Sequence, residues 1–195
     1  GSGVVAKQRG KALAEKGPEL HFITYSAPAR MGSLKSDLFY HEGRVSDYPL
    51  FDYQPYELVL ASKMVEVTLA HELDLLHVHY AIPHASAAVL ARDILQAQGI
   101  QIPVVTTLHG TDITLLGREP AFEPVISHAI NRSDAVTAVS ESLRRDTLEL
   151  FGIERAIQVV HNFICTKHFE RAADEVFRKS IAPKREPIIS HISNF

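Results

Sequence analysis

The sequence predicts an α/β protein in which helices cover both faces of a parallel sheet, and three observations support that fold class. Short apolar strands alternate with helical segments from residue 20 to residue 161. Strands separated by helices imply right-handed crossovers and a parallel sheet. Two strands, VVTTL at 104–108 and AVTAV at 135–139, are apolar enough to be buried on both faces.

Apolar patterns, and the residues that end them, predict the individual elements. Within residues 1–165, Gly17 and Gly152 stop the first and last of five predicted helices, and Ser140 caps the last of these. A broad apolar stripe over residues 57–72 is suited to packing on a sheet. The predicted strands cover residues 20–24, 38–41, 75–78, 104–108, 135–139 and 157–161. The predicted helices cover residues 4–16, 57–72, 83–98, 120–131 and 141–151, and HGTDI at 109–113 is predicted as a loop.

The first residues resemble a turn that normally follows a strand. A Rossmann-like sheet begins with a strand whose carboxyl end opens into a glycine-rich turn, and Gly1-Ser2-Gly3 stands where that turn is expected. We therefore expect the first strand and the natural N-terminus to lie upstream. Gly-Ser is also a common remnant of expression vectors, and no signal-peptide pattern is visible.

The length of 195 residues corresponds to one domain and a remainder. Residues 1–165 are predicted to form the Rossmann-like domain without its first strand. Residues 166–187 are rich in charge and broken at Pro183 and Pro187, which indicates a short exposed helix followed by a linker. Residues 188–195 have the pattern of a strand that would open a second domain, absent from this chain.

The composition excludes several classes of protein. Hydrophobic residues make up 46% and charged residues 22%, as in an ordinary globular domain. A net charge of −3 gives no basic excess for nucleic acid. No apolar run is long enough to span a membrane. Cys165 is the one cysteine, so no intrachain disulfide can form and a reducing cytoplasm is expected.

Polar residues gather at the expected carboxyl ends of four successive strands. In open α/β sheets ligands bind at that edge, and glycines before the first helix would add backbone N–H groups for an anion. The convergence predicts a ligand site there. Its segments are YAIPH at 80–84, HGTD at 109–112, SES at 140–142 and HNF at 161–163.

Two other chemistries are disfavoured. His77 and His79 face the same side of a strand, with His84 close by, but no carboxylate or cysteine stands at a matching ligand spacing. A packing or hydrogen-bonding role is favoured, and no metal is predicted. Cys165 has no base positioned beside it, so it is not predicted to be a nucleophile.

The same strand ends carry a resemblance to a known family. VVTTLHGTDITLLG, SDAVTAVSESLRRDT and VVHNFI resemble the acceptor-domain motifs of glycosyltransferase family 4, whose retaining enzymes have the two-domain GT-B fold. HVHYAIPHASAAVLA, with HGTDIT and GSGVVA, resembles the branch of that family that glycosylates L-malate in bacillithiol biosynthesis. The resemblance covers essentially the whole chain, and HISNF at 191–195 resembles the first strand of the family's C-terminal domain.

The resemblance implies the N-terminal, acceptor-binding half of a GT-B enzyme. Such an enzyme transfers N-acetylglucosamine from UDP-N-acetylglucosamine to the hydroxyl of L-malate with retention, and needs no metal or other cofactor. It implies no nucleic-acid or membrane partner, and a homo-oligomer stays open. The residues that match are Ser2, Tyr80 and Thr107 for the acceptor, Gly1, Ser2, Gly3, His109 and Asn162 for the donor, and His109 for catalysis.

Two positions depart from the family pattern, and two other functions stay open. Lys7-Gln8 stands where the family usually has Thr-Glu, and Cys165 stands where Asp is usual. The first alternative is a family 4 transferase with a sugar or lipid acceptor. The second is a non-catalytic module that binds a sugar nucleotide or a carboxylate. An acidic pair and a diphosphate-binding Arg/Lys pair in the C-terminal half would favour catalysis.

Overall fold

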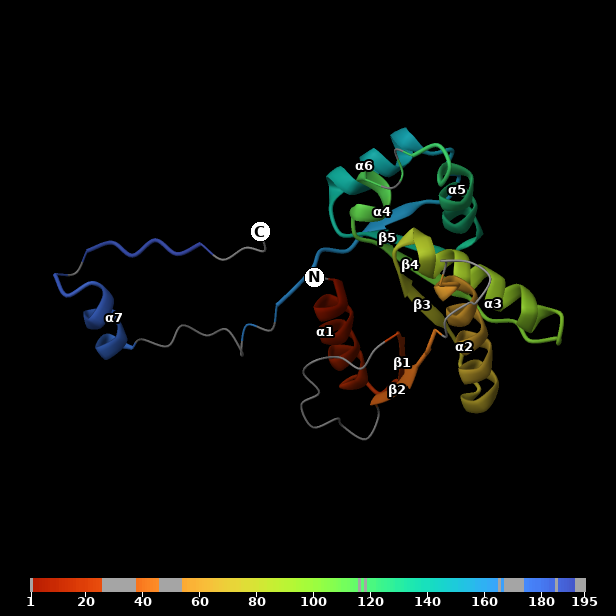
Figure 1. Cartoon of the computed structure of the whole chain (residues 1–195), viewed down its shortest axis with the longest axis horizontal. Helices are drawn as coiled ribbons and strands as arrows, with labels where there is room; N and C mark the ends of the chain where they lie inside the picture. The colour runs from red at the N-terminus through yellow and green to blue at the C-terminus, as the bar shows by residue number, and fades with distance from the viewer. Residues whose placement is uncertain are drawn as a thin grey trace. The chain divides into compact units, whose positions relative to one another are not determined.

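The computed structural model of the chain describes residues 2–25, 38–45, 54–115, 117, 119–164, 166, 174–184 and 186–191 (Figure 1). The chain divides into two compact units, residues 1–162 and residues 163–195. All the described strands belong to the first unit. The described part of the second unit holds one short helix, and each unit is treated by itself below.

Strands and helices alternate through most of the first unit. The strands are β1 (Leu20–Thr24), β2 (Leu38–Glu42), β3 (Leu76–His79), β4 (Val104–Leu108), β5 (Ala135–Ala138) and β6 (Ile157–Val159). The helices described in the first unit are α1 (Ser2–Ala14), α2 (Tyr56–His71), α3 (Ser86–Gln96), α4 (Thr111–Thr114), α5 (Glu123–Arg132) and α6 (Glu141–Leu150), with a π-helical turn η1 (Ala81–Ala85). Helix α7 (Glu175–Ile181) lies in the second unit.

All strand pairs in the described residues are parallel, as predicted, but the strands form two sheets. One sheet has the order β1-β2 and the other β3-β4-β5-β6. The register places His79 beside Thr107, and Thr107 beside Thr137. Since side chains alternate along a strand, these three residues share one face of the larger sheet.

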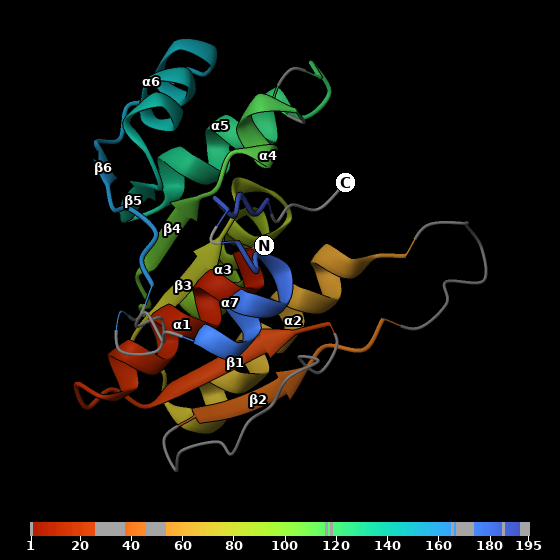
Figure 2. The ribbon, with the colours of Figure 1, turned by 90° about the vertical axis from the view of Figure 1, so that its left-hand side faces the viewer.

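Helices pack on both faces of the sheets. Phe22 and Ile23 are neighbours on β1, so they point to opposite faces. Phe22 lies against Gly10 of α1, whereas Ile23 packs on the core that α2 and α3 line. Figure 2 shows α1 and α2 on opposite sides of β1 and β2. The predicted arrangement, a parallel sheet covered on both faces, is confirmed.

The core consists of two apolar clusters, one beneath α2 and α3 and the other beside α5 and α6. The first joins α2 and α3 to β3 and β4. The second joins α5 and α6 to the ends of β4, β5 and β6. Among their fully buried members are Leu60, Leu95, Val104, Leu108, Ile113, Ile126 and Ile130.

We expect Gly10→Ala to lower the stability of the domain. A Cβ at Gly10 would overlap the Phe22 ring, which is itself stacked on Tyr40 at a centroid distance of 5.2 Å. Overpacking costs about 1–3 kcal/mol, whereas the gain in helix propensity is about 1 kcal/mol. Urea unfolding should therefore give a lower free energy of unfolding for Gly10→Ala than for the unchanged protein. Gly3→Ala is the matched control, because a Cβ there meets nothing within 4 Å; equal stability of the two variants would contradict the packing argument.

The structure corrects some predicted boundaries. Part of the predicted HGTDI loop is the short helix α4, because Gly110 accepts hydrogen bonds from the N–H groups of Ile113 and Thr114. Helix α5 begins at Glu123 rather than at residue 120, with Pro124 in its first turn. The predicted helix 83–98 divides into η1 and α3.

The second unit contains α7, capped by Asp174, whose Oδ1 accepts from the N–H of Phe177 at 2.8 Å. No residue of α7 is buried, which confirms the predicted short exposed helix. Residues 188–191 form no strand, because a strand needs a partner to pair its N–H and C=O groups; residues 192–195 lie outside the described part. No helix among the described residues is both long and apolar enough to cross a membrane.

Candidate site at the carboxyl ends of β3 and β4

Polar side chains line the α1-facing side of the larger sheet, at the carboxyl ends of its strands. The Thr107 hydroxyl is at their centre and is fully buried. It lies 2.8 Å from His77 Nε2 and 2.8 Å from Thr137 Oγ1. Arg9 of α1 donates to it from Nη1 at 3.4 Å. Three strands and one helix therefore meet at a single hydroxyl group.

Arg9 brings a permanent positive charge to this network. Its Nη2 is buried and has no hydrogen-bond partner among the described residues. Because a buried donor without a partner is costly, this nitrogen is suited to a ligand acceptor. Guanidinium groups bind carboxylates and phosphates well. Sequence reasoning missed Arg9, although it follows Ser2 by seven residues, two helical turns, and so lies on the same side of α1.

Two histidines and a tyrosine extend the site to the end of β4. His79 Nδ1 and His109 Nε2 are 2.8 Å apart. The Tyr80 ring lies 5.1 Å from the His109 ring and 6.0 Å from the His84 ring, centroid to centroid. The structure thus places the predicted residues Tyr80, Thr107 and His109 at one location.

His77, His79 and His109 are neutral at pH 7 because their surroundings lower the pKa of each imidazole. Desolvation, then Arg9 and His109, lower the pKa of His77 to about 4, although part of that residue is exposed. Desolvation, His77 and His109 lower the pKa of His79 to about 3. Desolvation, then Arg9, lowers the pKa of His109. Imidazoles that can donate or accept hydrogen bonds therefore surround one fixed cation, which is a suitable environment for an anion.

The backbone at Tyr80 is strained. Its φ is 81° and its ψ is 143°, a region that residues with side chains rarely adopt. Hydrogen bonds hold it there: its N–H donates to Thr107 O at 2.9 Å, and its carbonyl accepts from Ala85 N at 3.2 Å. Strain of this kind, about 1–3 kcal/mol, gathers at functional sites, which supports the prediction for Tyr80.

Asp112 fixes the two strand-end segments to each other. Its carboxylate is buried and accepts from Ala81 N at 2.7 Å and from Gly110 N at 3.2 Å. Burial raises its pKa, and the backbone hydrogen bonds oppose that rise. Asp112 is therefore a positioning residue. The imidazole of His109 bonds to His79, not to Asp112.

The remaining predicted residues lie elsewhere or outside the described part. Ser2 begins α1 and Gly3 lies in its exposed first turn; Gly1 is outside the described residues. Asn162 is exposed just after β6, two strands away from β4. Sequence reasoning did not single out Thr137, and it set aside His77 and His79.

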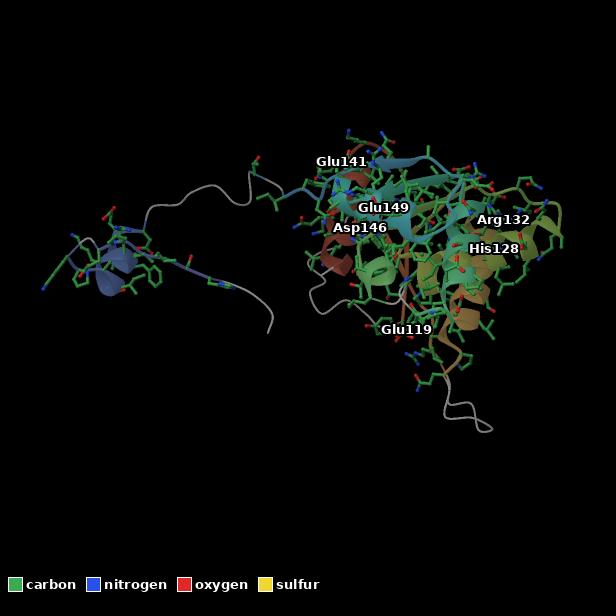
Figure 3. All side chains as sticks on the ribbon, turned by 90° about the horizontal axis from the view of Figure 1, so that it is seen from above. Glu119, His128, Arg132, Glu141, Asp146 and Glu149 are labelled. Atoms are coloured by element: carbon green, nitrogen blue, oxygen red, sulfur yellow. The ribbon has the colours of Figure 1, made fainter. Side chains whose placement is uncertain are left out.

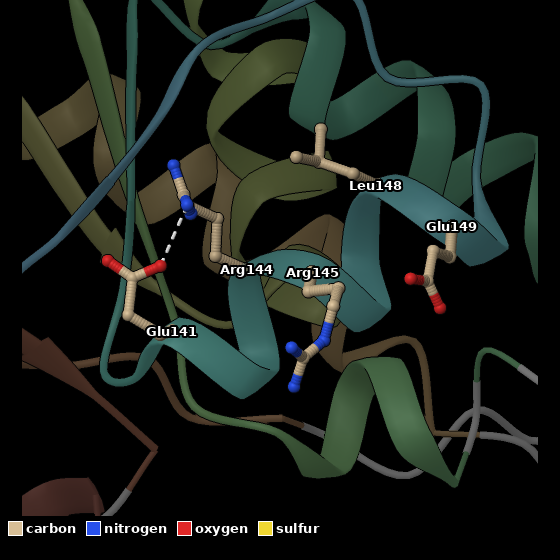
Figure 4. A pocket seen from close by; sticks show the side chains of 5 residues that line it. All are labelled: Glu141, Arg144, Arg145, Leu148 and Glu149. Atoms are coloured by element: carbon tan, nitrogen blue, oxygen red, sulfur yellow. Dashed lines mark ion pairs between the residues drawn. The ribbon is translucent and has the colours of Figure 1, made fainter.

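Other hollows of the surface do not belong to this site. One of about 340 Å³ lies along α6 (Figure 4), where Glu141 pairs with Arg144 at 2.8 Å. Figure 3 shows Glu141, Asp146 and Glu149 projecting from the same helix. All its lining residues come from one helix, and both charges are present, so it does not define a ligand.

Histidine burial near the site should make folding sensitive to acid. Desolvation lowers the pKa of His84 from 6.5 to about 4, and its Nδ1 has no partner among the described residues. Between those pH values the unfolded chain binds a proton that the folded chain excludes, so stability falls as pH falls. We expect His84→Asn to reduce this slope by up to about 1.4 kcal/mol per pH unit.

Urea unfolding at several pH values between 4 and 7 measures this slope. His128→Asn is the control, because His128 is exposed on α5 (Figure 3). An unchanged slope in His84→Asn would show that folding does not lower the pKa of His84.

The fold and the site together define a class of protein. A Rossmann-like parallel sheet carries a cation and hydrogen-bonding side chains at the carboxyl ends of its strands, and such domains bind small anionic ligands there. Residues 1–168 match the model of Glycosyltransferase Family 4. The chain belongs to this family, and its fold is that of the N-terminal, Rossmann-like half of a GT-B protein.

Two curated proteins are similar to the chain. N-acetyl-alpha-D-glucosaminyl L-malate synthase of Bacillus anthracis is 47% identical over 196 residues, which cover 100% of this chain and 51% of that protein. The putative teichuronic acid biosynthesis glycosyltransferase TuaC of Bacillus subtilis (strain 168) is 30% identical over 108 residues, 53% of this chain and 26% of that protein. The chain spans about half the length of the first relative, and its matched residues cover about a quarter of the second.

Proposed function

We propose that the chain is the acceptor-binding half of a retaining glycosyltransferase that transfers N-acetylglucosamine from UDP-N-acetylglucosamine to L-malate. The observation that carries this proposal is the Nη2 of Arg9, which has no partner among the described residues, beside the buried Thr107 hydroxyl. A dicarboxylate acceptor needs a cation and hydrogen-bond donors, and Arg9, Tyr80 and neutral imidazoles provide them. The named activity of the 47% identical relative supports the same acceptor.

Each predicted residue has a role in this proposal. Ser2, Tyr80 and Thr107 contribute to acceptor binding, and Thr107 does so chiefly by positioning Arg9, because its own hydroxyl is buried and already bonded. His109 contacts the transferred sugar. Gly1, Ser2, Gly3 and Asn162 serve the donor, most of whose site belongs to the C-terminal half. No metal or other cofactor takes part.

Sugar transfer by the full-length protein tests the proposal. We expect transfer from UDP-N-acetylglucosamine to L-malate, and weaker transfer in Tyr80→Phe, which removes one hydroxyl donor. Residues 1–195 alone should be inactive, because the donor site is incomplete. Efficient transfer to a sugar or lipid, with none to malate, would show that malate is not the acceptor. Binding of UDP-N-acetylglucosamine without transfer to any acceptor would favour a non-catalytic module.

We also propose that a further strand lies between β1 and β3, and that residues 188–195 begin the donor-binding domain. Among the described strands β1 pairs with β2 alone and β3 with β4 alone. The core that contains α2 takes in residues of both β1 and β3, so the two sheets share one layer of helices. In a longer protein that includes this strand, the amide hydrogens on the β3 edge away from β4 should exchange more slowly than in residues 1–195 alone. Equal exchange rates would contradict the proposed strand.

A further inference from the structure

Three histidines from distant parts of the sequence meet at the amino end of β1. They are His21 on β1, His41 on β2 and His71 in the last turn of α2. Each offers one nitrogen, and these three nitrogens all lie within 4.8 Å of one another. The ring centroids are 5.0 Å apart for His21 and His41, and 4.3 Å apart for His21 and His71.

This cluster is separate from the candidate sugar-transfer site. His21 is two residues from Ile23 on β1, so it faces the α2 side of the small sheet, whereas Arg9 and Thr107 lie on the α1 side of the larger sheet. His21 is also near the amino end of its strand, and the candidate site is at carboxyl ends. The two sites can therefore be tested independently.

We propose that His21, His41 and His71 form a binding site for a divalent transition metal ion, with Zn²⁺ as the natural occupant and water as its fourth ligand. Three imidazoles and an open position are a common zinc environment. Imidazole also suits the other late first-row metal ions, but it does not suit Mg²⁺ or Ca²⁺. The ion would fasten β1 and β2 to the end of α2.

The hydrogen bonds of His21 already favour the tautomer that a metal requires. Its side chain is 1% exposed, and its Nε2 lies 2.8 Å from Glu19 Oε1. A carboxylate at that nitrogen keeps the proton on Nε2 and leaves a lone pair on Nδ1, which points at His41 Nε2 from 2.8 Å. A carboxylate behind a ligating histidine is the usual outer partner at zinc sites.

Only small movements separate this arrangement from a tetrahedral one. Two nitrogens that lie 2.0–2.1 Å from one zinc ion are about 3.3 Å apart, so His21 and His41 need to separate by about half an ångström. His71 is exposed, so its ring can turn towards the ion. When zinc binds, His41 changes tautomer: Nε2 gives its proton to water and Nδ1 takes one up from water, so the imidazole stays neutral and no other covalent change is needed.

Two charged side chains, Lys63 and Glu66, act on His41 and form an ion pair with each other. Since zinc competes with protons for imidazole, binding should weaken in acid.

Zinc titration of the chelator-treated full-length protein tests this inference. Competition with a chromophoric chelator should give one tight site per chain, and Co²⁺ should produce the visible absorption of tetrahedral nitrogen ligation. His71→Asn should abolish tight binding; because His71 is exposed, this variant should still fold. Glu19→Gln should weaken binding about tenfold while keeping the three ligands.

The control is His128→Asn, which removes an exposed histidine outside the cluster and should bind zinc like the unchanged protein. Zinc should also raise the melting temperature of the unchanged protein and of His128→Asn, but not of His71→Asn. Absence of a tight site, or a tight site that survives both His71→Asn and His41→Asn, would overturn the proposal. Neither result bears on sugar transfer, which has its own site.

Discussion

In the full-length protein, Arg9→Gln is expected to raise the KM for L-malate about 10- to 150-fold. The variant removes a charge-assisted hydrogen bond to a carboxylate, which is worth about 1.5–3 kcal/mol, and 1.36 kcal/mol corresponds to tenfold. Thr107 keeps its contacts with His77 and Thr137 in the variant. Steady-state kinetics with malate as the varied substrate measures the effect.

Lys11→Gln is the matched control, because it removes one positive charge from the exposed part of α1. It should leave the KM for malate unchanged and thereby separate a specific contact from a change in net charge. If Arg9→Gln and Lys11→Gln had the same KM as the unchanged protein, Arg9 would not bind the acceptor.

Replacement of His109 is expected to lower kcat by one to three decades. That loss corresponds to about 1.4–4 kcal/mol of transition-state stabilisation. The imidazole lies at the end of β4, is bonded to His79 rather than to Asp112, and is neutral at pH 7 because desolvation and Arg9 lower its pKa. It can therefore donate to or accept from the sugar near the reacting carbon. Measurements on His109→Ala, His109→Asn and His109→Gln together test this role.

Melting curves separate a catalytic from a structural role for His109. If the imidazole only holds the loop, its loss should lower the melting temperature and weaken malate binding. Low kcat with unchanged melting and unchanged UDP affinity supports contact with the sugar. Full kcat in all three variants would refute the catalytic role.

The strands were the most predictable part of the fold. The predicted bounds of β1 and β4 agree with the structure at both ends, because each is a short apolar run with a proline before it. Helix α4 was not predictable from local sequence, since Asp112 is positioned by a hydrogen bond to Ala81, which is 31 residues away. The separation of β1 from β3 into different sheets also could not be predicted, because it depends on which strands pair, and the strand propensity of a segment does not determine its partner.

For the candidate site, sequence reasoning found the residues at strand ends and missed those that arrive from other elements. Tyr80 and His109 follow buried strands, so their place at the sheet edge could be predicted. Arg9 reaches Thr107 because α1 crosses the sheet at a position set by contacts such as that of Gly10 with Phe22. The zinc cluster has ligands 20 and 30 residues apart, a spacing that matches no short motif.

The larger sheet presents an unusual surface to α1, and this has a thermodynamic consequence. The side chains on that face include His77, His79, Thr107 and Thr137, and Arg9 of α1 donates to Thr107. The opposite face is apolar apart from Thr106, which bonds to Ser133. Adhesion of the helix to these strands therefore owes little to the hydrophobic effect. An anion bound between Arg9 and the strand ends would itself contribute to that adhesion, so docking of α1 and occupancy of the site are linked equilibria. Acceptor binding should then tighten α1 by mass action, by about 2.7 kcal/mol at a concentration of 100 times Kd.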